Sequence, residues 1–199
     1  MAINASQVKQ LRDATAAPMM VCKKALQETE GDYDQALRIL REQGLADAKK
    51  RAGRVTADGM VDAYIHLNNR VGVLLEVNCE TDFVARNEQF RCMVHDVAMH
   101  IAAANPFYVS IDEIPEAILE QEKEIYRTQA LAEGKQEKFV DKIIEGRLKK
   151  YYEQVCLLEQ PFVKDQDVTV GQLVSKTAAS TGENVVVRRF TRYLLGEGA

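Results

Sequence analysis

The sequence predicts an α+β protein in which a three-helix N-terminal module is joined to a small antiparallel sheet of about three strands, packed with helices and a helical hairpin. Three observations support this prediction. Apolar residues recur at helical spacing through residues 3–44, with capping residues between the runs. Residues 71–78 alternate with a period of two, as in a half-buried strand. A second β-rich run follows only at residues 185–194, after a long stretch of helical periodicity.

The first 44 residues are expected to form three short helices. Asn4 is placed as the N-cap of the first helix, and Pro18 suits the first turn of the second, where no backbone N–H is needed. Gly31 is expected to close the second helix, Asp32 to cap the third, and Gly44 to end it. A module of this size has a very small core, so it is predicted to be only marginally stable alone.

The composition changes after this module, where the chain becomes polar, basic and poor in large apolar residues. Residues 46–58 are therefore predicted to be a partly helical linker between a module of residues 1–45 and an α+β dimerisation and core domain of residues 59–199. The basic run offers cations that RNA could contact. Without interleaved aromatic residues, such a run is more typical of a solvated surface.

The sheet is expected to begin as a hairpin. Residues 60–67 and 71–78 form its strands, and Asn68 and Asn69 supply the turn. An isolated hairpin is not stable in water, so residues 185–194 are predicted to add the third strand. Such a sheet leaves apolar area and edges uncovered, which predicts a homodimer formed through the central sheet.

Helices are expected between the second and third strands. One covers residues 87–104, and two longer ones, at residues 115–133 and 139–155, are joined by a short Glu-Gly-Lys turn into a helical hairpin. Residues 159–164 are predicted to be an irregular connector. A last short helix, capped by Thr169, then leads into the third strand.

Charge and composition exclude several classes of protein. A formal net charge of −4 argues against a protein whose main work is holding nucleic acid. No apolar run approaches about 18 residues and the N-terminus has no apolar signal segment, so a cytoplasmic protein without a membrane partner is predicted. The four cysteines are widely spaced and include no Cys-x-x-Cys pair, which favours reduced thiols over disulfides or a zinc site.

The sequence offers no constellation typical of catalysis. It contains no glycine-rich phosphate loop. His95 and His100 are five residues apart, which separates them around a helix and does not suit joint metal ligation, while His66 is expected to pair with a neighbour across the hairpin. Acidic neighbours disfavour a thiolate at Cys79. A binding protein is therefore predicted rather than an enzyme, with no cofactor and no metal ion.

The most informative stretch is Thr-Asp-Phe-Val at residues 81–84, which lies at a corner where a strand is followed by a helix. Small polar residues suit such a corner because their side chains accept from the free backbone N–H groups of a helix start. Phe83 is the unusual member. Spacing alone favours an inward position, as the first core residue of the following helix. The alternative is an outward position, as a wedge for a partner.

The surrounding eight residues, Asn-Cys-Glu-Thr-Asp-Phe-Val-Ala at 78–85, resemble without a break the signature of bacterial elongation factor Ts, the nucleotide exchange factor of elongation factor Tu. The resemblance implies that Thr81, Asp82, Phe83 and Val84 bind the GTPase domain of elongation factor Tu. Phe83 would wedge between its helices and disturb Mg²⁺ and phosphate binding. The implied partner is therefore elongation factor Tu, both GDP-bound and nucleotide-free.

The resemblance extends through nearly the whole chain. Residues 1–45 resemble the ubiquitin-associated-like module of that family, and Arg12, Met19 and Met20 stand at the positions that contact the GTPase domain. The usual Thr-Gly-Ala-Gly-Met-Met-Asp is replaced by Thr-Ala-Ala-Pro-Met-Met-Val at residues 15–21, which predicts a stiffer loop. The chain length suggests the compact form of the family, whose members pair through their central sheets.

Two other classes of protein stay open on the sequence alone. One is a ubiquitin-associated-type adaptor that only tethers another protein. The other is an accessory factor that binds RNA through residues 49–54 and 147–151, where basic residues gather.

Overall fold

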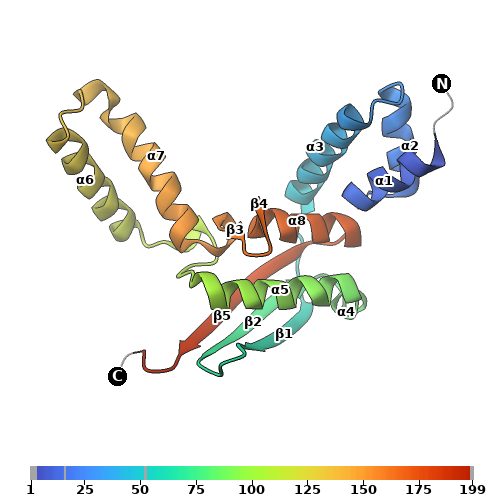
Figure 1. Ribbon diagram of the computed structural model, residues 1–199. Helices are drawn as coiled ribbons and strands as arrows, with labels where there is room; N and C mark the ends of the chain where they lie inside the picture. Colours follow the sequence, from blue (N-terminus) through green and yellow to red (C-terminus); the bar gives the residue numbers. More distant parts are fainter. Residues whose placement is uncertain (1–3, 16, 52, 198–199) are drawn as a thin grey trace.

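The computed structural model of the protein describes residues 4–15, 17–51 and 53–197. Its architecture is α+β, which confirms the predicted fold class. The N-terminal module and a helical hairpin project to the same side of a sheet-bearing centre from its two ends, so that the molecule has the outline of a V (Figure 1). No helix within the described ranges is both long and apolar enough to span a membrane.

The N-terminal module consists of α1 (Ala5–Thr15), α2 (Met19–Glu28) and α3 (Tyr33–Arg51). The predicted caps are present, because the side-chain oxygen of Asn4 accepts from the N–H of Ser6 at 3.0 Å and that of Asp32 accepts from the N–H of Gln35 at 3.0 Å. One small cluster of buried residues holds the three helices together: Val8, Leu11, Cys22, Ala25, Leu26, Ala36 and Leu40.

The third helix is longer than predicted. It continues through Gly44 to Arg51, so the prediction that Gly44 ends it is wrong. Glycine ends a helix when it adopts a left-handed conformation, and Gly31, with φ of +92°, does so after α2 while Gly44 does not. Part of the predicted linker is therefore helical, as expected, and the non-helical connection before the sheet is short.

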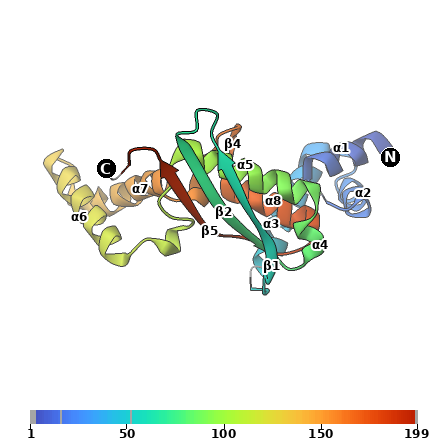
Figure 2. The same ribbon diagram turned by 90° about the horizontal axis from the view of Figure 1, so that it is seen from below.

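The central sheet has the strand order β1-β2-β5, and both pairings are antiparallel. Its strands are β1 (Asp58–Ile65), β2 (Val71–Cys79) and β5 (Val185–Leu194), so the last strand closes the sheet as predicted. Helices α5 (Glu88–Ala104) and α8 (Val170–Thr181) cover one face, while no described segment covers the other (Figure 2). The side chains between the sheet and these helices form the main core, which includes Val73, Leu75, Val77, Phe90, Val94, Val97, Ile101, Leu157, Val170 and Val187.

The helical hairpin is formed by α6 (Glu116–Ala132) and α7 (Glu137–Val155), and Gly134 makes the turn with φ of +74°. This confirms the predicted hairpin. The pair points away from the sheet (Figure 1) and has its own cluster of buried residues, Ala130, Val140, Ile144 and Leu148.

Short elements complete the chain: η1 (Ile111–Glu113), η2 (Leu157–Glu159), β3 (Pro161–Phe162) and β4 (Asp165–Thr169). The connector predicted to be irregular in fact contains β3, which pairs antiparallel with β4. A two-residue strand is too short for a period of two to be recognised in the sequence.

The division of the chain near the end of α3 stays a prediction. We expect limited trypsin digestion to cut first within residues 49–54 and to leave a folded fragment beginning near Val55. The physical reason is that the module and the sheet-bearing part have separate apolar clusters, and Val55 in the connection is exposed. Uniform degradation, or a first cut within residues 82–104, would contradict this division.

Candidate functional site

The corner between β2 and α5 contains a single helical turn, α4 (Asp82–Ala85), which is separated from the end of β2 by two residues. Thr81 is its N-cap, with extended backbone, and its hydroxyl oxygen accepts from the N–H of Val84 at 3.5 Å. The Cys79 thiol donates to the Thr81 carbonyl at 3.2 Å. The predicted role of the small polar residues, which is to start a helix at this corner, is therefore confirmed.

Phe83 points away from the protein. Its side chain is 80% exposed, whereas its neighbour Val84 is 4% exposed and packs into the main core. The inward interpretation of Phe83 is therefore wrong, and Val84 supplies the core contact that the spacing suggested for Phe83. A large apolar side chain held in water on a capped turn is available for burial against another protein, which would be favourable.

Asp82 also faces solvent. Its carboxylate pairs with the guanidinium of Arg86 one turn later, at 2.8 Å, and both side chains are largely exposed. An exposed pair of this kind contributes little to stability because water and salt screen it. Both side chains therefore remain free to exchange this contact for one with a partner.

The same corner is held from the far end of the chain. Both backbone N–H groups of Glu80 and Thr81 donate to one carboxylate oxygen of Glu183, each at 3.1 Å, and the Thr81 hydroxyl donates to the other oxygen at 2.6 Å. Glu183 lies in the turn between α8 and β5, 102 residues beyond Thr81. No local sequence signal links two residues so far apart, so this contact could not be predicted from the sequence.

The module exposes an apolar surface of its own. Met19, Met20 and Val21, which we term the methionine patch, are all exposed at the start of α2, and Met20 is 72% exposed. Arg12 is exposed in the last turn of α1. Two adjacent methionines at a helix start cannot both face inward, so the sequence predicts at least one exposed methionine here. The structure exposes both, together with Val21. Methionine side chains adapt to irregular surfaces, which suits them to a protein partner.

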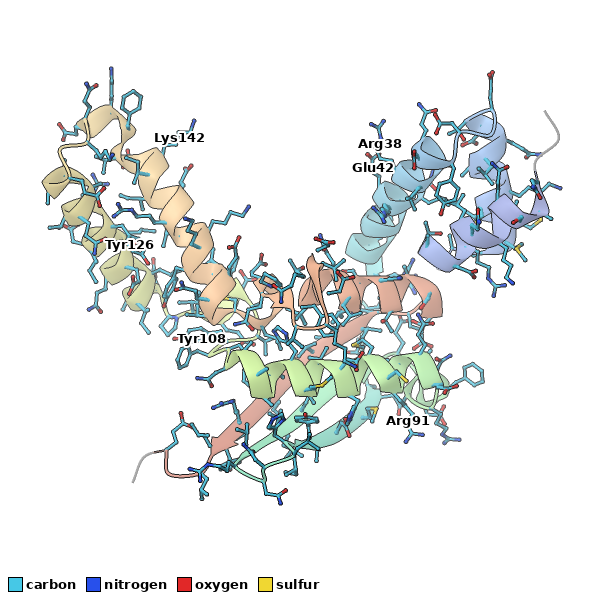
Figure 3. The ribbon with its side chains drawn as sticks, in the orientation of Figure 1. Arg38, Glu42, Arg91, Tyr108, Tyr126 and Lys142 are labelled. Atoms are coloured by element: carbon cyan, nitrogen blue, oxygen red, sulfur yellow. The ribbon has the colours of Figure 1, made fainter. Side chains whose placement is uncertain are left out.

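The module and α4 lie toward the same end of the molecule, and the helical hairpin lies toward the other, as both ribbon views show (Figures 1 and 2). Arg91, on the outer side of α5, marks the corner end of that helix in Figure 3. The two groups of predicted partner-binding residues therefore belong to elements at one end of the molecule.

The cysteine and histidine side chains that were considered for catalysis or metal binding make contacts within the fold. Burial, with the nearby Glu183 carboxylate, raises the pKa of the Cys79 thiol above its ordinary value, which disfavours a thiolate nucleophile. The backbone N–H of His66 donates to the Val71 carbonyl across the hairpin at 2.9 Å, as expected, while its ring forms a hydrogen bond at 3.0 Å with the hydroxyl of Tyr64 on β1. Within the part of the chain that the structure describes, no group of three His, Cys, Asp or Glu residues could hold a metal ion.

The arginines of the surface considered for RNA binding make contacts within the fold. The guanidinium of Arg147 donates to Gln129 and Glu133, Arg51 donates to the carbonyl of Ala178, and Arg54 donates to Glu80. Phosphate binding by these arginines would have to replace these contacts, whereas Lys149 and Lys150 of α7 are exposed.

Comparison with known proteins supports the resemblance in the corner. The family model described as Elongation factor TS matches residues 48–197. Elongation factor Ts of Acetivibrio thermocellus is 58% identical over 98% of this chain and 91% of its own length. Elongation factor Ts of Moorella thermoacetica is 58% identical over 98% of this chain and 97% of its own length. Elongation factor Ts of Alkaliphilus oremlandii is 57% identical over 100% of this chain and 91% of its own length. The similarity to these relatives includes the module as well as the sheet-bearing part.

Proposed function

The chain belongs to the elongation factor Ts family, and from this premise we propose that it acts in translation elongation as the guanine nucleotide exchange factor of elongation factor Tu. It is a binding protein that promotes release of GDP and performs no covalent chemistry. Its work is in the cytoplasm, and neither nucleic acid nor a membrane is a partner in the proposal.

The observation that carries the proposal is the exposure of Phe83 on an anchored corner. A P-loop GTPase holds its nucleotide with backbone N–H groups, a lysine and a Mg²⁺ ion. An apolar wedge that packs between helices of such a GTPase stabilises a conformation in which these ligands are displaced. By linkage, the exchange factor weakens nucleotide binding by the same factor by which nucleotide weakens binding of the exchange factor. The nucleotide-free complex is then resolved by GTP.

Two surfaces are proposed to bind the GTPase domain. One is the corner, where Phe83 inserts, Asp82 anchors and Thr81 starts the turn, while the buried Val84 supports the corner from behind. The other is the module, with Arg12 and the methionine patch. The sheet and the helical hairpin are proposed to reach the other domains of elongation factor Tu. Lys142 of α7 and Arg38 of α3 both project into the space between the two arms of the V (Figure 3).

Release of fluorescently labelled GDP from elongation factor Tu tests the proposal. The expected result is a release rate that rises with the concentration of this protein and returns to the intrinsic rate when it is omitted. Binding to elongation factor Tu with an unchanged release rate would instead support the adaptor alternative. RNA binding with a steep dependence on salt, in the absence of exchange, would support the accessory-factor alternative.

A homodimer through the central sheet is also proposed, and the support is the composition of the sheet face opposite α5. Paired residues in neighbouring strands share a face, so the register places exposed apolar side chains on this one. They are Val61, Ala63, Ile65, Leu74 and Tyr193. The apolar residues are contiguous, which is typical of a surface that another chain covers.

Analytical ultracentrifugation at micromolar concentration is expected to give a mass near twice the 22.4 kDa of one chain. Leu74→Glu, which places a charge in the centre of the open face, is expected to give a monomer because an unpaired charge cannot be buried there. The control is Leu131→Glu at the exposed end of α6, which should remain dimeric. A wild-type monomer at every concentration would disprove the dimer. The exposed Cys92 lies on α5, behind the sheet, so no disulfide is expected to hold the pair.

A further inference from the structure

Beyond the exposure of Phe83, the structure presents an unusual support beneath it. The carboxylate of Glu183 receives three hydrogen bonds from the two residues that precede α4. Hydrogen bonds to an ionised carboxylate are shorter and stronger than those between neutral groups. Gly182 makes this position accessible because, with φ of +77°, it ends α8 in the left-handed conformation and turns the chain toward the corner.

The support is reciprocal. While Glu183 accepts from the corner, the carboxylate of Glu80 accepts from the backbone N–H of Asn184 at 2.6 Å and from the guanidinium of Arg54 at 3.3 Å. The side-chain amide of Asn184 in turn donates to the Arg54 carbonyl at 3.1 Å. Three segments that are distant in sequence thus meet at one point: the end of β2, the turn before β5, and the connection after α3.

The end of α3 also makes a contact near this cluster. The guanidinium of Arg51 donates to the carbonyl of Ala178 at 2.9 Å, near the C-terminus of α8. The turn that carries Glu183 follows α8 directly. The last turn of α3 therefore contacts α8, and the Thr81 corner contacts the turn that follows α8.

The Glu183 carboxylate also sets the direction of the Thr81 hydroxyl. Because the hydroxyl donates its single proton to Glu183, its lone pairs are left to accept from the N–H of Val84, which starts α4. If the carboxylate were absent, the hydroxyl could rotate, and both N–H groups of the corner would lose their acceptor. The turn that carries Phe83 would then sample other conformations.

We propose that Glu183 is a positioning residue for nucleotide exchange: it holds the Thr81–Phe83 corner in the conformation that presents Phe83 to elongation factor Tu, without touching the partner itself. This inference rests on the proposed function. A corner that is already ordered loses little conformational entropy when it binds elongation factor Tu. Without the hydrogen bonds to Glu183, binding must also order the corner, and this lowers the free energy gained on association.

The test is stimulated GDP release by four full-length proteins: wild type, Glu183→Ala, Phe83→Ala and the double variant. Glu183→Ala is expected to lower kcat/KM for GDP-bound elongation factor Tu by roughly tenfold, the scale expected when a preorganised binding element must be ordered at association. In the Phe83→Ala background the same change is expected to cost less than about twofold, because a correctly placed corner has nothing left to insert. The matched control is Glu159→Ala, an exposed glutamate for which no side-chain contact is part of this network.

Glu183→Gln is the conservative variant. Its amide oxygen still accepts from the backbone N–H groups of Glu80 and Thr81, but its NH2 group cannot accept the proton of the Thr81 hydroxyl. Its kcat/KM is expected to lie between the values of wild type and Glu183→Ala. If circular dichroism shows that Glu183→Ala does not fold, Glu183→Gln replaces it in the test. The inference would be overturned if both Glu183 variants exchanged nucleotide at the wild-type rate. It would also be overturned if Glu183→Ala lowered kcat/KM by the same factor in wild type and in Phe83→Ala. Failure of the wild-type protein to accelerate release would overturn the proposed function itself, so the two failures are distinguishable.

Discussion

Phe83→Ala is expected to lower stimulated GDP release by about thirty- to a hundredfold and to leave the melting temperature almost unchanged. The ring is 80% exposed in the free protein, so its removal leaves no cavity in the fold. What is lost is its burial in elongation factor Tu, which is about 2–3 kcal/mol for a phenylalanine side chain. At about 1.4 kcal/mol per factor of ten, this loss corresponds to the stated range if the wedge acts mainly in the exchange step.

Release of labelled GDP and thermal unfolding by circular dichroism measure the two effects separately. Phe107→Ala is the matched control, since Phe107 is 69% exposed and follows the opposite end of α5. Its loss should change neither measurement. Asp82→Ala should lower exchange by less than Phe83→Ala, because one polar anchor in contact with water contributes about 1 kcal/mol. A Phe83→Ala protein that melts much earlier but exchanges normally would show that Phe83 stabilises the fold instead.

Phe90→Ala should have the opposite outcome, with a loss of about 3–5 kcal/mol in the free energy of unfolding. Phe90 is 0% exposed and is among the largest fully buried side chains of the protein. Its removal leaves a cavity in the main core between α5 and the sheet, which neighbouring side chains fill only in part. At about 2–4 °C per kcal/mol for a domain of this size, the melting temperature should fall by about 6–20 °C.

Differential scanning calorimetry measures this loss, and Phe90→Leu is the control, because a similar volume should recover most of the stability. Well below the new melting temperature, the folded Phe90→Ala protein should still accelerate GDP release, since α4 and its exposed ring are unchanged. A Phe90→Ala protein with wild-type stability would contradict the placement of this ring at the centre of the core.

These two phenylalanines show where sequence reasoning reached its limit. They are seven residues apart, a spacing that puts both on one face of an uninterrupted helix. The structure interrupts that helix: α4 ends at Ala85, and Asn87 adopts an extended backbone and caps α5 with its side chain. The break turns the two rings in different directions. Spacing alone favoured an inward Phe83, and the resemblance in residues 78–85 was needed to favour the outward position.

The sequence by itself determined the elements whose signals are local. Alternation located β1 and β2, Thr169 capped the last helix as predicted, with Gln172 completing a capping box, and Gly134 made the predicted turn of the helical hairpin. These features depend on residues within a few positions of one another, so their physical causes can be read along the chain. The eight-residue run at 78–85 likewise contains its family resemblance in contiguous residues.

Only the tertiary structure decided the features that depend on distant partners. Whether Phe83 is exposed depends on the packing of Val84 beneath it, and the backbone N–H groups of the corner find their acceptor in Glu183, which is 102 residues from Thr81. The continuation of α3 to Arg51 coincides with a contact to α8, which follows more than a hundred residues later. Such contacts form because the folded chain brings α8 and β5 back beside β2, and no local pattern records which carboxylate will meet which backbone N–H there.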